Sequence, residues 1–131
     1  MTSPDSTAAN AVVLVVEDEE LARLIITDYL KDGGFTVLQS ANAAQALQVL
    51  EERADVRAVV LDIVMPGTMD GIALAHAIHA RWPRMALLVI SGKGEPKRAA
   101  LPPGTGFLPK PYFGPSIVGR LQALLSGDDT A

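Results

Sequence analysis

Short apolar segments alternate along the chain with longer stretches in which apolar residues recur every three or four positions. Five apolar or β-branched segments are predicted to be strands, at 11–16, 36–39, 58–61, 86–90 and 106–108. Two of them, VVLVV and ALLVI, are apolar on both faces, which is typical of parallel strands covered by helices on either side. The alternation of strands with helical stretches predicts the α/β class.

The first stretch between strands is predicted to be a helix over 19–31. Its pattern places Leu21, Leu24 and Ile25 on one face, and two acidic residues at its start suit the positive end of a helix dipole. Gly33 and the glycine after it end the helix. This stretch therefore supplies the first of the helices that cover the sheet.

Three further stretches are predicted to be helices. Asn42, followed three residues later by Gln45, resembles a capping box at the start of the second helix. The third begins near Gly71 and ends before Pro83. Pro115 fits the first turn of a closing helix. The apolar stripe of that closing helix consists of Ile117, Val118, Leu121, Leu124 and Leu125.

The connection between Ser91 and Phe107 departs from this regularity. Seven of its fifteen residues are glycine or proline, which leaves room for at most a turn or two around 97–101. We therefore expect the fourth helix to be shortened.

The chain length of 131 residues fits one domain with a single core. We expect a disordered tail at 1–10, the folded domain at 11–125 and a second tail at 126–131. No apolar run approaches the roughly 20 residues needed to cross a bilayer, so no membrane insertion is expected. The start of the chain lacks the features of a secretory signal, which favours a cytoplasmic protein.

Charge and cysteine content exclude several classes of function. The net charge is −4 and the basic residues are scattered, so direct nucleic-acid binding has little support. The chain has no cysteine, which excludes disulfides and thiolate metal sites. Nothing resembles a P-loop or a dinucleotide fingerprint. Proteins are therefore the expected partners.

Charged or hydroxyl side chains follow four of the five predicted strands: Glu17 and Asp18, Asp62, Ser91, and Lys110. In an open parallel sheet, ligands bind beyond the carboxyl ends of the strands, so these residues are expected to converge. Carboxylates on neighbouring strands, which lie about 4.8 Å apart, would repel one another strongly. Several carboxylate oxygens without thiolate or imidazole favour Mg²⁺.

Four motifs at these strand ends, VVEDEE, LDIVMPGTMDG, VISG and FLPKPY, resemble those of the receiver domains of response regulators and hybrid histidine kinases. The resemblance covers roughly 11–125. It implies a doubly wound five-stranded parallel sheet with the flavodoxin-like strand order 2-1-3-4-5. It also implies a switch that is phosphorylated by a histidine kinase or a histidine phosphotransfer protein. Such a domain is not an enzyme in its own right, because it catalyses only its own phosphoryl transfer and dephosphorylation.

The resemblance assigns a role to each strand-end residue in the metal site. Asp62 is the expected phosphoryl acceptor and, with Asp18, a ligand of Mg²⁺. Glu17 is expected to act mainly through metal-bound water, and the backbone carbonyl of Val64 completes the coordination by the protein.

The remaining roles concern the phosphoryl group and the response to it. Lys110 is expected to pair with the phosphoryl oxygens, and Ser91 to donate its hydroxyl to one of them. Phe107 occupies the position of the family's switch aromatic and is expected to rotate inward with Ser91. Pro111 matches a position at which the family usually has a cis peptide bond.

Two alternatives stay open on the sequence. A pseudo-receiver would keep the fold as a protein-binding module that functions without phosphorylation, although Asp18, Asp62, Ser91 and Lys110 are all present. A flavodoxin-like enzyme is disfavoured because the loop after the first strand is not rich in serine, threonine or glycine to hold a cofactor phosphate.

Overall fold

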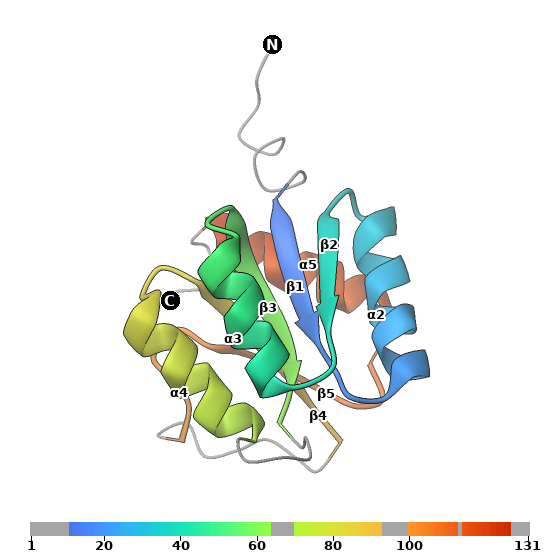
Figure 1. Ribbon diagram of the computed structural model, residues 1–131. Helices are drawn as coiled ribbons and strands as arrows, with labels where there is room; N and C mark the ends of the chain where they lie inside the picture. The colour runs from blue at the N-terminus through green and yellow to red at the C-terminus, as the bar shows by residue number, and fades with distance from the viewer. Residues whose placement is uncertain (1–10, 64–69, 93–99, 113, 127–131) are drawn as a thin grey trace.

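The computed structural model describes residues 11–63, 70–92, 100–112 and 114–126, and a five-stranded parallel sheet runs through the middle of them (Figure 1). Its strands lie in the order β2-β1-β3-β4-β5. They are β1 (Val12–Val16), β2 (Thr36–Ser40), β3 (Val56–Asp62), β4 (Ala86–Ser91) and β5 (Gly106–Pro109). The predicted fold class and strand order are confirmed.

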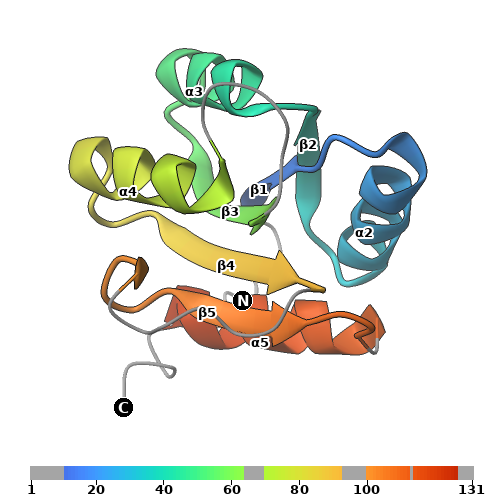
Figure 2. The ribbon, with the colours of Figure 1, turned by 90° about the horizontal axis from the view of Figure 1, so that it is seen from below.

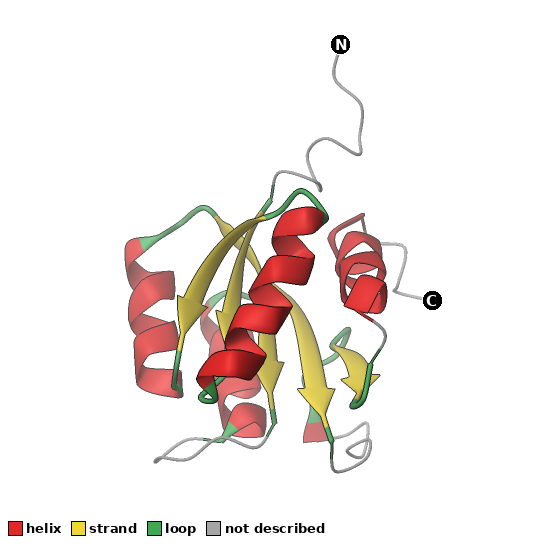
Figure 3. Cartoon of the chain, turned by 90° about the vertical axis from the view of Figure 1, so that its right-hand side faces the viewer, coloured by secondary structure: helices red, strands yellow, loops and turns green. Residues whose placement is uncertain are grey.

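Helices cover both faces of the sheet. They are α2 (Glu20–Asp32), α3 (Ala43–Glu52), α4 (Gly71–Arg81) and α5 (Gly114–Ser126). The helices α3 and α4 lie on one face and α2 and α5 on the other (Figures 2 and 3). None of these helices has the length and apolar character to cross a membrane.

The predicted boundaries differ slightly from those of the structure. Helix α5 continues to Ser126, one residue into the expected tail, and the rest of that tail and 1–10 lie outside the described residues. Between β4 and β5 the structure describes residues 92 and 100–105, and none of them is in an α-helix. Most of the turn expected at 97–101 lies outside the described residues.

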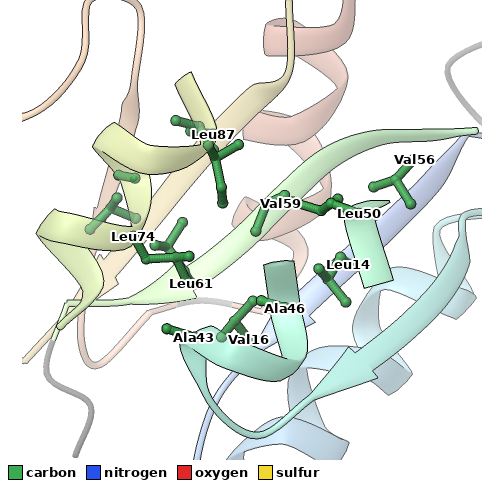
Figure 4. Packing of buried hydrophobic residues seen from close by; sticks show 13 residues of the cluster. Leu14, Val16, Ala43, Ala46, Leu50, Val56, Val59, Leu61, Leu74 and Leu87 are labelled. Carbon is green, nitrogen blue, oxygen red and sulfur yellow. The ribbon is translucent and has the colours of Figure 1, made fainter. Parts of the chain in front are cut away.

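The strands alternate their apolar side chains between two cores. In β1, Leu14 and Val16 pack towards α3 and α4, whereas Val13 and Val15 pack towards α2 and α5. Figure 4 shows the first of these cores, where side chains of β1, β3 and β4 meet those of the two helices. This burial on both faces explains why the strands read as unbroken apolar runs.

The apolar face predicted for α2 is not the face that packs on the sheet. Leu21, Leu24 and Ile25 are 63%, 44% and 42% exposed, while Ile26 and Leu30 are buried against the core. Helix α2 is apolar on more than one side, and the sheet covers only the narrow stripe formed by residues four apart. An exposed apolar surface therefore remains on α2.

Side-chain caps fix where three of the helices begin. Asn42 Oδ1 accepts from the backbone N–H of Gln45 at 2.9 Å, which confirms the predicted cap of α3. Asp70 Oδ1 accepts from Ala73 N at 2.8 Å in the same way at the start of α4. The carboxylate of Glu19 caps α2. The caps at Glu19 and Asp70 lie where α2 and α4 leave the carboxyl edge of the sheet.

Candidate functional site

Three charged side chains converge at the carboxyl edge of the sheet. The register pairs Val16 with Leu61, so Glu17 and Asp62 follow side by side on neighbouring strands. Lys110 comes from the end of β5 and reaches across β4, and its Nζ lies 2.7 Å from Asp62 Oδ2. The same Nζ lies 3.7 Å from Glu17 Oε1. The predicted convergence of Glu17, Asp62 and Lys110 is therefore present in the structure.

The base of the lysine is held by β4. Lys110 N donates to the carbonyl oxygen of Ser91 at 2.8 Å, and the peptide bond between Lys110 and Pro111 is cis, as expected. A Cβ placed on Gly92 would lie 3.6 Å from Lys110 Cβ. Ser91 itself is buried at the end of β4, and its strand neighbour Ile90 pairs with Asp62. Ser91 therefore lies at the same edge as the two carboxylates.

Glu17 is a buried carboxyl, and only one of its two oxygens accepts a hydrogen bond from the described residues. Its Oε2 accepts from Glu19 N at 3.1 Å, whereas its Oε1 is buried and has no hydrogen-bond partner among the described residues. The pKa of Glu17 is raised from 4.5 to about 7, mainly by burial and also by the carboxyls of Asp18 and Asp62, against the opposing effects of the Glu19 N–H and of Lys110. A bound cation would relieve this cost of ionising Glu17.

This pKa makes a prediction for the metal-free protein. Because the pKa of Glu17 is higher in the folded chain than in the unfolded chain, stability falls as the pH rises from about 4.5 to about 7. Glu17→Gln removes that loss, so in EDTA at pH 8 the variant should be more stable by on the order of 2 kcal/mol. At pH 4.5 the difference should vanish. Urea unfolding at both pH values measures this, and a variant that is less stable at pH 8 contradicts it.

Lys110 stays charged in this cluster. Burial alone would lower its pKa, but the hydrogen bond and charge of Asp62, together with the charge of Glu17, outweigh burial and raise the pKa above its ordinary value. When the carboxyls of Glu17, Asp18 and Asp62 are ionised, one ammonium group leaves the site with a formal charge of −2. One divalent cation would neutralise that charge.

The donor atoms fit Mg²⁺ only if other oxygens join them. Among the described residues, no group of three Asp, Glu, His or Cys side chains could hold a metal ion by itself. Mg²⁺ usually takes one or two carboxylates and keeps several waters, and it accepts substrate oxygens in the remaining positions. The buried Glu17 Oε1, which accepts no hydrogen bond from the described residues, and the buried Asp62 carboxylate match that requirement.

The other predicted site residues are less clearly placed at the cluster. Asp18 is exposed, although its carboxyl is close enough to Glu17 to raise the pKa of that group. Val64 lies outside the described residues. Phe107 is half-buried and packs against the core beneath α3 and α4. Phe107 is therefore described by its contacts with the core.

Sequence reasoning missed two residues that shape this edge. Gly71 N donates to the carbonyl oxygen of Ile63 at 2.8 Å, and a Cβ at Gly71 would lie 2.1 Å from the carbonyl oxygen of Asp62. In the sequence, Gly71 marked only the start of a helix. Arg23 donates to the carbonyl oxygen of Glu17 at 2.8 Å. Its position five residues after Asp18, as the only basic residue in the first turns of an acidic helix, was the available signal.

The chain is similar to part of two longer proteins, and it spans about a quarter or less of the length of each. A putative NtrX-like response regulator of Rickettsia bellii (strain RML369-C) is 41% identical over 114 residues, which are 84% of this chain and 24% of the relative. The sensor kinase CckA of Brucella abortus (strain 2308) is 33% identical over 126 residues, which are 93% of this chain and 13% of the kinase.

Solved structures have the same fold. A response regulator receiver protein from Sinorhizobium medicae WSM419 has a TM-score of 0.82 and 27% identity, and the match covers 88% of this chain and 94% of that protein. NtrX from Brucella abortus has a TM-score of 0.82 and 31% identity over 90% of this chain and 27% of that structure. Residues 13–122 match the family described as the response regulator receiver domain. The chain therefore belongs to the receiver domain family of two-component response regulators.

Proposed function

We propose that this receiver domain is a phosphoacceptor in a two-component phosphorelay, with Asp62 as the residue that takes the phosphoryl group. The observation that carries the proposal is the 2.7 Å contact between Lys110 Nζ and a buried Asp62 carboxylate that lies beside Glu17. A buried carboxylate at a sheet edge, paired with a lysine from another strand, is suited to receive an anionic group. The proposed domain is 11–125.

Mg²⁺ belongs to the proposal, because receiver domains generally bind Mg²⁺ at the acidic phosphorylation site. Asp18 and Asp62 would hold it directly, Glu17 through water, and Val64 through its backbone carbonyl. The metal would supply positive charge next to the oxygens of the transferred group. The buried Glu17 Oε1 supports a cation at this edge.

The protein's own residues perform the transfer by position and charge. A carboxylate oxygen of Asp62 attacks the phosphorus of a phosphohistidine in line, and the P–N bond breaks with its electron pair on the imidazole nitrogen. Lys110 offsets the negative charge that develops on the equatorial oxygens during the transfer. Ser91, buried at the end of the neighbouring strand, donates its hydroxyl to one phosphoryl oxygen of the product.

The response to phosphorylation is proposed to begin at Ser91 and Phe107. Ser91 moves towards the phosphoryl group, and Phe107 rotates towards the core that it already contacts. Because phenylalanine has no hydroxyl, this signal depends on packing alone. The result is a change in protein–protein contacts.

A histidine kinase or a histidine phosphotransfer protein, located in the cytoplasm, is the proposed phosphodonor. Such a partner has to cover the carboxyl edge of the sheet to bring its phosphohistidine to Asp62. Helix α2 starts at this edge, and its exposed Leu21, Leu24 and Ile25 provide an apolar surface beside it. The acidic residues at the helix start leave little reason to expect a nucleic acid there.

The test is incubation of the purified protein with acetyl phosphate and Mg²⁺, followed by intact mass spectrometry. We expect the wild type to gain one phosphoryl mass, and Asp62→Asn or wild type in EDTA to gain none. Asp70→Asn is the matched control, because Asp70 is an exposed aspartate at the same edge and asparagine also caps helices. That variant should behave as the wild type. A wild type that gains no mass would favour the pseudo-receiver, and an Asp62→Asn variant that gains the phosphoryl mass would contradict Asp62 as the acceptor.

A further inference from the structure

The side chain of Arg23 connects α2 to the end of β1 and to β2. From the second turn of α2, its Nη1 donates to the carbonyl oxygen of Glu17 at 2.8 Å, just beyond the end of β1. Its Nε donates to Gln39 Oε1 of β2 at 3.2 Å. The side chain is half-buried. Two bonds from one planar guanidinium fix its orientation better than one bond could.

The bond to the Glu17 carbonyl holds the peptide unit that precedes Asp18. The carbonyl group of Glu17 and the N–H of Asp18 belong to one planar peptide unit, so holding the carbonyl fixes the plane from which Asp18 starts. The preceding peptide unit is also held, because the Glu17 N–H donates to the carbonyl oxygen of Ser40 at 3.1 Å. The Glu19 N–H, one residue after Asp18, is held by the Glu17 carboxylate. The backbone is thus held on both sides of Asp18.

We propose that Arg23 is a positioning residue for the metal site. It holds the Glu17–Asp18 peptide unit so that the Asp18 carboxylate faces the cation. This inference rests on the proposed function, because it assigns Asp18 to a Mg²⁺ site. Arg23 would not touch the metal or the phosphoryl group. Both of its acceptors are neutral oxygens, so the guanidinium binds backbone and amide without competing for the carboxylates.

Position and charge make opposite predictions for Arg23. A fixed positive charge near a cation site repels the cation, so on charge alone Arg23→Met would tighten Mg²⁺ binding. Loss of the peptide contact would weaken binding, because residues that orient the ligands of a metal contribute about 10-fold to 100-fold to its affinity. Arg23→Lys keeps the charge and can replace only one of the two bonds. The order of affinities therefore separates the two effects.

The experiment titrates Mg²⁺ alone into the full chain and follows binding by calorimetry and by the Mg²⁺-dependent rise in melting temperature. We expect the dissociation constant to rise about 10-fold in Arg23→Met and by a smaller factor in Arg23→Lys. Arg81→Met is the matched control, because Arg81 sits at the far end of α4 and pairs with Glu51. It should bind Mg²⁺ as the wild type does.

Each outcome decides between the two claims. A wild type that binds no Mg²⁺ overturns the metal part of the proposed function and this inference with it. A wild type that binds, with Arg23→Met equal or tighter, overturns the positioning role alone. If Arg23→Met does not fold in EDTA, Gln39→Ala removes one of the two bonds and leaves every charge in place. That variant should bind Mg²⁺ more weakly than the wild type, and equal binding counts against the positioning role.

Discussion

Replacing Lys110 with methionine should slow phosphorylation by acetyl phosphate about 100-fold or more, because it removes the cation whose Nζ lies 2.7 Å from the Asp62 carboxylate. Methionine keeps most of the apolar stem that packs beside Gly92. It cannot offset charge on the phosphoryl oxygens, so the loss should appear in the rate at saturating acetyl phosphate.

Quench-flow or timed mass spectrometry measures that rate in the presence of Mg²⁺. Lys31→Met is a suitable control, because Lys31 is an exposed lysine in the last turn of α2 and its loss should leave the rate unchanged. Lys110→Arg keeps the charge of the side chain but not its shape, and its phosphorylation rate should fall between those of Lys110→Met and the wild type. A Lys110→Met rate within about 3-fold of the wild type would contradict the role of Lys110 in the transfer, since a lost charge-stabilising donor costs more than that.

Replacing Gly71 with alanine should destabilise the fold by about 3 kcal/mol or more. The added Cβ would lie 2.1 Å from the carbonyl oxygen of Asp62 and 2.5 Å from Ile63 Cα. Both are backbone atoms, so they cannot rotate away as a flexible side chain could. Either α4 or the end of β3 has to shift, and both movements disturb Asp62, the proposed phosphoryl acceptor.

Chemical denaturation of Gly71→Ala beside Gly119→Ala tests this point. A Cβ at Gly119, in α5, would meet nothing within 4 Å, so alanine there should stabilise the helix by about 0.5–1 kcal/mol. The two substitutions are chemically identical and are expected to have opposite signs. Equal stabilities for Gly71→Ala and the wild type would show that the start of α4 does not approach the end of β3 this closely.

The sequence predicted the sheet and much of the site because both depend on local pattern. Strands that are buried on both faces read as unbroken apolar runs, and the charged residues after them had to meet once the sheet was parallel. Glu17, Asp62 and Lys110 could therefore be predicted together. The order of the strands came from the family resemblance, because periodicity carries no information on which strands are neighbours.

What the sequence could not predict depends on contacts between elements. Helix α2 offers apolar residues on two sides, and only packing decides that Ile26 and Leu30 face the core while Leu21 does not. The requirement for glycine at position 71 arises from the backbone at the end of β3, which belongs to a different element. The position of Arg23 marks it as unusual in an acidic helix start, but the pattern of side chains does not show that it bonds to a backbone carbonyl.

The most direct test of the central claim is to identify the modified residue chemically. Protein treated with acetyl phosphate and Mg²⁺ is reduced with borohydride, which converts an acyl phosphate of aspartate to homoserine, and is then digested and sequenced by mass spectrometry. We expect homoserine at Asp62 alone, and none when EDTA replaces Mg²⁺. Homoserine at Asp18 or Asp70 with Asp62 intact would contradict the assignment of Asp62 as the phosphoryl acceptor.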